Sequence, residues 1–257
     1  MHLSETLNKD GVVQIHSLLC GEGLELLRKG IAANLERPSP MHRRMENPDE
    51  GYFFSDFNNW RRLELIHSVA HDPKLVNLVC ELTQSTHCWL FHDHVLVKEG
   101  QAKATPWHQD RPYYIFKGDK NVSIWITADD VPRNSSLLFL RGSHLDNNLY
   151  LPKSFDNDAI IAQKQGLEQL DETTFSPKDV LDFELKAGDA LLFFHRTIHA
   201  SRTHNHIDKR RALSIRYLCD GASLTEQYVN ATPPFDRMGV TVSENGPIPE
   251  NFFPKLR

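Results

Sequence analysis

Apolar side chains in the first third of the chain recur at the spacing of amphipathic helices. Residues 21–36 carry one apolar face, formed by Leu24, Leu27, Ile31 and Leu35. A second helix is predicted to begin at Asp72-Pro73, because aspartate suits the N-cap and proline the first helical position. Its apolar face is formed by Leu75, Val76, Val79 and Leu82. We expect both helices to pack against the outside of a sheet.

From residue 88 onward the apolar period changes from that of helices to that of strands. The predicted strands span residues 88–97, 121–127, 137–140, 180–185, 190–194 and 211–219, with a short one at 11–15. Lys98-Glu99-Gly100 is expected to end the first of the barrel strands. Many short strands separated by turn signals are typical of a barrel or jelly roll, so the chain is predicted to be mainly β with flanking helices.

Three stretches show neither period. Residues 41–62 are polar and rich in turn formers, which fits a lid or binding loop and a surface excursion equally well. Residues 146–179 are expected to be an insertion, with a helix near 158–170, and the proline-rich tail to wrap the barrel. At 257 residues the whole chain is predicted to be one domain, with N-terminal helices to about 87, a core at 88–219 and a tail at 220–257.

Charge and cysteine usage narrow the class of protein. A formal net charge of -5 gives no electrostatic case for nucleic-acid binding, and no apolar run is long enough to span a bilayer. The first residues have no basic and apolar pattern of a signal peptide. The cysteines at 20, 80, 88 and 219 are scattered in apolar contexts, so they are predicted to be buried, reduced thiols of a cytoplasmic protein.

Candidate metal chemistry centres on Trp107-His108-Gln109-Asp110. His108 and Asp110 are two residues apart, so an extended strand would direct both side chains to one face. An imidazole and a carboxylate are two thirds of the 2-His-1-carboxylate site that holds non-haem Fe(II). Closing a barrel brings distant strands together, and His199 is the best candidate for the third ligand, with His195 as its competitor.

Other histidine pairs have similar spacing, as expected by chance in a chain with 14 histidines. The pair His144 and Asp146 follows Gly142-Ser143, and such turn chemistry makes a loose platform for a metal. His92 and His94 lie in an apolar strand, where they could also line the pocket or form hydrogen bonds within the core. Both pairs are weaker candidates than His108 and Asp110.

A candidate anion site follows eleven residues after His199. Arg210 and Arg211 point to opposite faces of the predicted strand, so only one of them can enter the barrel. A guanidinium there would bind one carboxylate of a dicarboxylate through two hydrogen bonds, which suits arginine better than lysine.

Taken together, these motifs resemble the phytanoyl-CoA dioxygenase family of Fe(II)/2-oxoglutarate oxygenases, which have a double-stranded β-helix fold of the jelly-roll or cupin-like type. The resemblance covers residues 88–219 well and the N-terminal helices loosely. The shared features are the WHQD motif, the Trp125 strand, the turns Gly142-Ser143-His144 and Gly188-Asp189, and His199 with Arg210. The sequence departs from the family at Asn134-Ser135-Ser136 and at Arg141, which concern loop shape and the substrate pocket.

The resemblance implies a role for each candidate residue. His108, Asp110 and His199 would hold Fe(II), since the family ligand is the histidine that precedes Ala/Gly-Ser. The family pattern assigns the 5-carboxylate of 2-oxoglutarate to Arg210, with help from Ser201, and places Trp125 beside the cosubstrate. Lys98 would contact 2-oxoglutarate or remain a solvated strand end. Tyr113 and Tyr114 would border the pocket.

The implied reaction consumes 2-oxoglutarate and O2, releases succinate and CO2, and hydroxylates an unactivated carbon of a small molecule. Asp110 occupies the position that related halogenases leave open for chloride, so hydroxylation is favoured over halogenation. Epimerisation, cyclisation and desaturation remain open as outcomes, and the oligomeric state is not readable from the sequence.

The substrate is less defined. The family name suggests an acyl-CoA, whereas relatives hydroxylate ectoine, amino acids, antibiotic precursors and phosphonates. Arginines at 43, 44, 61, 62 and 111 favour a small anionic or zwitterionic metabolite, although solvated surface arginines explain them equally well. The alternatives are an acyl-CoA hydroxylase with the same mechanism and a non-catalytic, cupin-like protein that binds a metal or another ligand.

Overall fold

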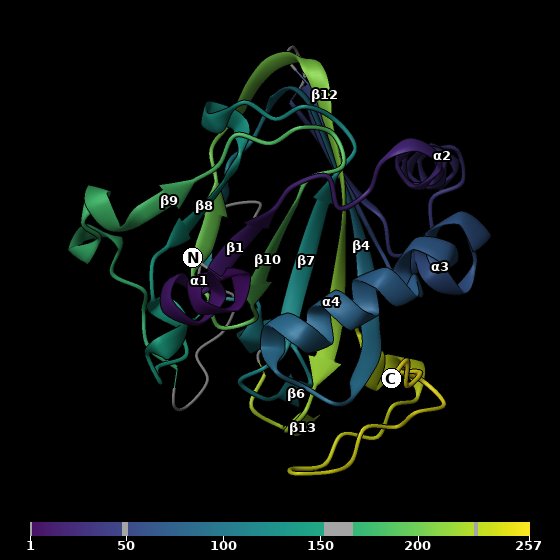
Figure 1. Ribbon diagram of the computed structural model, residues 1–257, viewed down its shortest axis with the longest axis vertical. Coiled ribbons are helices and arrows are strands. Elements are labelled where there is room, and N and C mark those ends of the chain that lie inside the picture. The colour runs from purple at the N-terminus through teal and green to yellow at the C-terminus, as the bar shows by residue number, and fades with distance from the viewer. Residues whose placement is uncertain (1, 48–50, 152–166, 229–230) are drawn as a thin grey trace.

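The computed structural model describes residues 2–47, 51–151, 167–228 and 231–257. Two antiparallel β-sheets face each other around a cavity, and helices cover the outer face of the larger sheet (Figure 1). This is the predicted mainly-β architecture with flanking helices.

Within the described residues the larger sheet has seven strands in the order β1-β10-β7-β12-β4-β3-β2. They are β1 (Val12–Ile15), β10 (Ala190–Phe194), β7 (Val122–Thr127), β12 (His204–Cys219), β4 (Cys88–Ala102), β3 (Gly51–Phe57) and β2 (Arg43–Asn47). The smaller sheet is ordered β5-β11-β8-β9. Its strands are β5 (Thr105–His108), β11 (His199–Ser201), β8 (Leu137–Leu140) and β9 (Val180–Asp182). A short third sheet pairs β13 (Ser223–Leu224) with β6 (Phe116–Lys117).

The described residues that precede β4 in the sequence form four α-helices, which lie on the near side of the larger sheet in Figure 1. They are α1 (Leu3–Asp10), α2 (Gly21–Glu36), α3 (Glu64–Ala70) and α4 (Pro73–Thr83). Helices α2 and α4 were predicted, and the Asp72 carboxylate accepts a hydrogen bond from Lys74 N (2.8 Å) as an N-cap should. Helices α1 and α3 escape the sequence pattern because they have eight and seven residues, too few to establish a helical period.

Alternation along the central strands separates a hydrophobic face from a polar one. On β12, Leu213 and Ile215 point outward and belong to the core beneath the helices, whereas Arg210, Ser214 and Arg216 line the cavity. Strand β7 behaves in the same way, with Ile124 and Ile126 facing the helices. The period-two pattern of the sequence therefore specifies which side chains face the cavity.

Several predicted boundaries are wrong. Strand β4 does not end at Val97 but continues to Ala102, because it pairs on both sides, with β12 and β3, beyond that point. Lys98 is therefore not a strand end. The predicted strand at 180–185 is shorter, and the polar stretch 41–62 is not a loop: it contains the hairpin strands β2 and β3 and joins the edge of the larger sheet. Polar residues form strands here because β3 pairs with β4 at the sheet edge and β2 pairs with β3.

The C-terminal tail packs back against the core. Cys88 N donates to the carbonyl of Arg257 (3.1 Å), and the tail packs on Phe91 and Phe116. Most of the predicted helix at 158–170 lies outside the described residues. Short 3-10 turns include η2 (Arg111–Tyr113) and η3 (Arg133–Ser135), both near the cavity.

The cysteine prediction is correct for three of the four positions. Cys80, Cys88 and Cys219 are buried free thiols, whereas Cys20 is exposed, because it stands at the N-cap of α2 rather than on its apolar face. Within the part of the chain that the structure describes, no helix combines the length and apolar character needed to cross a membrane.

Candidate active site

The histidines of the predicted triad meet on two neighbouring strands of the smaller sheet. His199 on β11 is the direct partner of His108 on β5. Strand β5 ends at His108, and Asp110 has helical backbone angles (φ -69°, ψ -34°) at the start of η2, so the expectation that both lie on one extended strand is wrong. The turn nevertheless directs the carboxylate back, and ligand atoms of the three residues lie within 4.8 Å of one another.

Hydrogen bonds to backbone carbonyls fix the Nδ1 atom of each imidazole. The Nδ1–H of His108 donates to the carbonyl of Pro106 (2.8 Å), and that of His199 donates to the carbonyl of Thr197 (2.9 Å). Because a carbonyl only accepts, both rings carry their proton on Nδ1 and direct an unprotonated Nε2 into the site. Such backbone bonds are the usual partners of metal-binding histidines.

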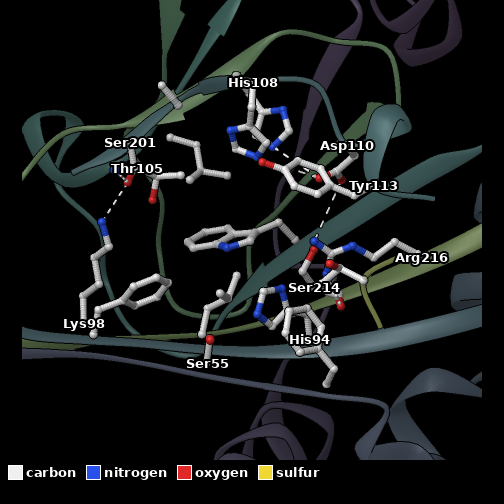
Figure 2. A pocket seen from close by; sticks show the side chains of 18 of the residues that line it. Ser55, His94, Lys98, Thr105, His108, Asp110, Tyr113, Ser201, Ser214 and Arg216 are labelled. Carbon is white, nitrogen blue, oxygen red and sulfur yellow. Dashed lines mark hydrogen bonds and ion pairs between the residues drawn. The ribbon is translucent and has the colours of Figure 1, made fainter. Parts of the chain in front are cut away.

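The two oxygens of the Asp110 carboxylate likewise have different surroundings. Its Oδ2 accepts a hydrogen bond from Ser123 Oγ (2.8 Å) and lies 3.8 Å from Nη2 of Arg216. Its Oδ1 lies 3.9 Å from Nε2 of each triad histidine. One oxygen is thus fixed by the protein, and the other remains available to a cation (Figure 2).

The electrostatics keep all three groups in the form that binds a metal. Burial lowers the pKa of His108 to about 3 and also lowers that of His199, so both imidazoles are neutral at neutral pH. Burial alone would raise the pKa of Asp110, but Arg216 and the two imidazoles outweigh it and lower this pKa. Two neutral imidazoles and one carboxylate are the donor set of the facial triad for Fe(II), so the residues fit that ion.

The rival histidine motifs are not assembled into such a group. Among the described residues, His108, Asp110 and His199 form the one cluster of three potential ligands within this reach. His144 Nε2 bonds to the carbonyl of Asn8 (3.1 Å), and its ring stacks on Phe194. His195, the competitor for the third position, is buried 4.9 Å from the Tyr114 ring and lies outside this cluster.

Two buried cations lie at the other end of the cavity. Arg210 and Lys98 are direct partners on β12 and β4, and their side chains are 6 % and 1 % exposed. Lys98 Nζ donates to Ser201 Oγ (2.8 Å), which places the predicted hydroxyl between the lysine and the triad (Figure 2). The alternative of Lys98 as a solvated strand end is wrong.

Within the part of the chain that the structure describes, neither cation has an anionic partner. Burial lowers the pKa of Arg210 to about 10, and burial together with Arg210 holds the pKa of Lys98 well below the usual value. No carboxylate of the described residues opposes either shift. Since an unpaired buried charge is costly, these two cations form an incomplete site that an anion would complete.

Arg211, the alternative to Arg210, lies on the outer face and pairs with Asp129 (2.5 Å). Trp125 lines the cavity, with the Arg210 guanidinium 5.7 Å from its ring centre. Tyr114 also lines it, and its hydroxyl accepts a hydrogen bond from Arg216 Nε (2.9 Å). The structure therefore brings every residue predicted to hold the iron or 2-oxoglutarate to one cavity.

Two residues at the site were missed from the sequence. Arg216 is 6 % exposed and reaches Asp110, as does Ser123 from the neighbouring strand. Both positions were readable in principle, because Arg216 shares the strand face of Arg210 and Ser123 that of Trp125. The signal for both residues is the strand period of two.

The cavity has a volume of about 330 Å³, and the hairpin β2–β3 forms its remaining wall through Arg43, Met45, Phe53, Ser55 and Phe57. Of the five arginines proposed to contact an anionic substrate, only Arg43 lines this cavity. Arg111 is buried against the carbonyls of Tyr114 and Gln227. The others bond elsewhere: Arg44 to Glu46, Arg61 to the carbonyl of Phe252 and Arg62 to Asp56 and Asn59.

A jelly roll with a His-Asp-His cluster next to a buried basic pocket defines a non-haem iron oxygenase. Consistent with this, the sequence matches the family model of phytanoyl-CoA dioxygenase over residues 7–212. The chain belongs to this family of iron- and 2-oxoglutarate-dependent enzymes, which confirms the predicted enzyme class and cofactors. The non-catalytic alternative is thereby set aside.

Solved structures with the same fold include the epimerase SnoN in complex with Fe3+, α-ketoglutarate and nogalamycin RO (TM-score 0.77, 20% identity, 99% of this chain and 97% of that one). The carbocyclase SnoK of nogalamycin biosynthesis is similar, with a TM-score of 0.77 and 17% identity over 99% of this chain and 95% of that one. EvdO2 from Micromonospora carbonacea var. aurantiaca, complexed with 2-oxoglutarate, is also similar, with a TM-score of 0.64 and 17% identity over 87% of this chain and 92% of that one. No curated protein matches at the sequence level.

Proposed function

We propose that the protein is a dioxygenase in which Fe(II) is held by His108, Asp110 and His199. The observation that carries this assignment is the state of the triad: each ligand has its second polar atom bonded by the protein and its first directed at a common point. Iron, when bound with 2-oxoglutarate and O2, supplies the oxidation of an unactivated C–H bond. The side chains supply position and charge.

The cosubstrate is assigned to the basic end of the cavity. Arg210 would bind the 5-carboxylate of 2-oxoglutarate in a bidentate manner, with Lys98 and Ser201 completing its hydrogen bonds. Trp125 would border the carbon chain, and Tyr114 would support the site indirectly, through Arg216. Arg210 and Lys98 have no carboxylate partner among the described residues, which supports this placement, since the 5-carboxylate would supply a counter-charge.

For the primary substrate we propose a small polar metabolite with an anionic or zwitterionic character, which is hydroxylated. The cavity is lined on its substrate side by both polar and apolar groups, and Arg43 provides an exposed cation at its edge. An acyl-CoA remains the alternative substrate of the same reaction. The same fold in SnoN, an epimerase, and SnoK, a carbocyclase, supports epimerisation and cyclisation as alternative outcomes.

Two further assignments belong to this proposal. We assign the chain to a single catalytic domain, since helices, barrel and tail share continuous packing in the described residues. We place it in the cytoplasm, because three buried free thiols suit a reducing compartment.

The test is an anaerobic titration of metal-free protein with Fe(II) and then 2-oxoglutarate, monitored through the visible charge-transfer band of the chelated cosubstrate. The proposal expects the band to appear at one equivalent of each. Iron binding without such a band would refute the placement of the cosubstrate.

A further inference from the structure

Two polar side chains on the substrate side of the cavity each have a buried atom with no hydrogen-bond partner among the described residues. His94 on β4 and Ser214 on β12 are direct partners across the two strands, and both line the cavity. The Nε2 of His94 and the Oγ of Ser214 are buried and form no hydrogen bond with any described residue. They face the triad from the opposite wall, below Asp110 and Arg216 in Figure 2.

The position of this pair separates it from the sites described above. Along the inner face of the larger sheet, Lys98 and Arg210 form one row, and His94 and Ser214 form another, four residues away on each strand. A spacing of four residues in a strand corresponds to roughly 13 Å. The pair therefore lies far from the proposed 5-carboxylate pocket, on the side left for the primary substrate.

The surroundings hold the imidazole in place. Phe57, its partner on β3, stacks on the His94 ring with centroids 3.8 Å apart. Burial, followed by Arg216 and His92, holds the pKa of His94 well below the usual value, so the ring is neutral with one donor and one acceptor nitrogen. Ser214 likewise both donates and accepts.

The nearest cation does not turn this pair into an anion site. Arg216 directs Nε to the Tyr114 hydroxyl, Nη1 to the carbonyl of Ser214 (3.0 Å) and Nη2 towards Asp110. Its charge is thus committed to the Asp110 carboxylate. A ligand group at His94 and Ser214 meets two neutral groups, each able to donate and accept.

From this geometry, and resting on the proposed function, we propose that His94 and Ser214 form a subsite for an uncharged hydroxyl group of the primary substrate. A hydroxyl donates to one of the two side chains and accepts from the other, so it satisfies both. A hydrocarbon at this position would leave both side chains without a hydrogen-bond partner. A carboxylate would find no cation there to neutralise its charge, because Arg216 already pairs with Asp110. The substrate is therefore a hydroxylated compound whose anionic group, if present, lies towards Arg43.

The experiment compares pairs of ring compounds that differ by one hydroxyl, such as cyclohexanecarboxylate and 4-hydroxycyclohexanecarboxylate, together with uncharged pairs. Binding is measured anaerobically as the perturbation of the charge-transfer band of the Fe(II)–2-oxoglutarate enzyme. We expect the hydroxylated member to bind roughly tenfold more tightly or better, the value of one hydrogen bond to a buried group. In His94→Leu and Ser214→Ala this preference disappears, whereas His94→Gln restores part of it.

His92→Leu is the matched control, because His92 is a buried histidine two residues away on β4 that does not line the cavity. It is expected to retain the preference. A panel in which no hydroxylated member binds better than its partner, or a preference that survives in both His94→Leu and Ser214→Ala, would overturn the subsite. Failure of the proposed function is distinguishable, because the charge-transfer band would then be missing before any ring compound is added.

Discussion

The two walls of the cavity differ in how completely their polar atoms are bonded. Around the triad, the second atom of every ligand has a partner: the carbonyls of Pro106 and Thr197 for the imidazoles, and Ser123 for Asp110. On the facing wall, His94 Nε2 and Ser214 Oγ have no partner among the described residues. A wall that is satisfied in advance suits a rigid metal site, whereas an unsatisfied wall requires a ligand.

The basic end of the cavity lies between these two extremes. Arg210 donates to the carbonyl of Ser135, and Lys98 to the carbonyl of Lys103 and to Ser201, yet neither has a counter-charge among the described residues. The comparison therefore predicts graded effects: removal of a metal ligand costs most, removal of Arg210 less, removal of a contact that supports the triad less again, and removal of Lys98 least.

The largest effect is expected for His199→Ala. The variant loses one of three ligand atoms, and we expect its Fe(II) affinity to fall by more than about 100-fold, since even supporting residues contribute about 10- to 100-fold. Anaerobic Fe(II) titration measures this loss, which also abolishes the charge-transfer band. His144→Ala removes the histidine of the rival motif and is expected to bind Fe(II) normally. Loss of Fe(II) binding in His144→Ala with normal binding in His199→Ala would instead identify His144 as the metal ligand.

Arg210→Ala comes next. Removing one partner of a buried, charged contact costs about 2–5 kcal/mol, so the dissociation constant of 2-oxoglutarate should rise roughly 100-fold while Fe(II) still binds. The matched control is Arg211→Ala, the adjacent arginine that pairs with Asp129 on the outer face. Equal weakening in both variants would show a general loss of structure instead of a lost anion site.

Much of this site was predictable because strands follow a strict alternation. The period of two separated Arg210 from Arg211, and the motif around His108 identified the triad in spite of the turn that carries Asp110. The substrate wall was not predictable in the same way. Polar residues 43–57 form strands because they extend an existing sheet edge, a tertiary effect that local sequence does not contain.

Lys98 illustrates a second reason why part of the site could not be predicted from the sequence. Lys98-Glu99-Gly100 has the composition of a strand end, but pairing with β3 and β12 carries the strand through it and buries the lysine. Arg216 was overlooked for the opposite reason: its charge in an apolar strand has meaning only once Asp110 is placed beside it. Both cases depend on contacts between residues far apart in the sequence.

Arg216→Gln tests the support of the triad. The glutamine is uncharged and shorter, so Asp110 loses the cation beside Oδ2 while Ser123 still donates to it. We expect Fe(II) affinity to fall about 10-fold, at the lower end of the range for groups that orient metal ligands. Replacing Fe(II) with Co(II) gives visible absorption bands that report the coordination geometry. Unchanged bands and affinity would show that Ser123 alone positions the carboxylate.

The smallest effect concerns Lys98 and depends on pH. Burial first, and then Arg210, lower the pKa of Lys98, so its charge is lost at a pH below the usual lysine range. The protonated form binds a carboxylate and the neutral form does so weakly, so 2-oxoglutarate binding should weaken as the pH rises through this lowered pKa. Because the carboxylates of the cosubstrate are already ionised there, they add no slope of their own.

In Lys98→Met this dependence should disappear, and the dissociation constant of 2-oxoglutarate should match that of the wild type at its high-pH limit. By linkage, bound cosubstrate raises the pKa of Lys98, so binding near the folded pKa takes up a proton, which calorimetry in buffers of different ionisation enthalpy measures. We expect a difference of at most about tenfold between the protonated and neutral forms, the value of a single charge-assisted hydrogen bond. A slope that persists in Lys98→Met would assign the titration to another group and leave Arg210 as the main anchor of the cosubstrate.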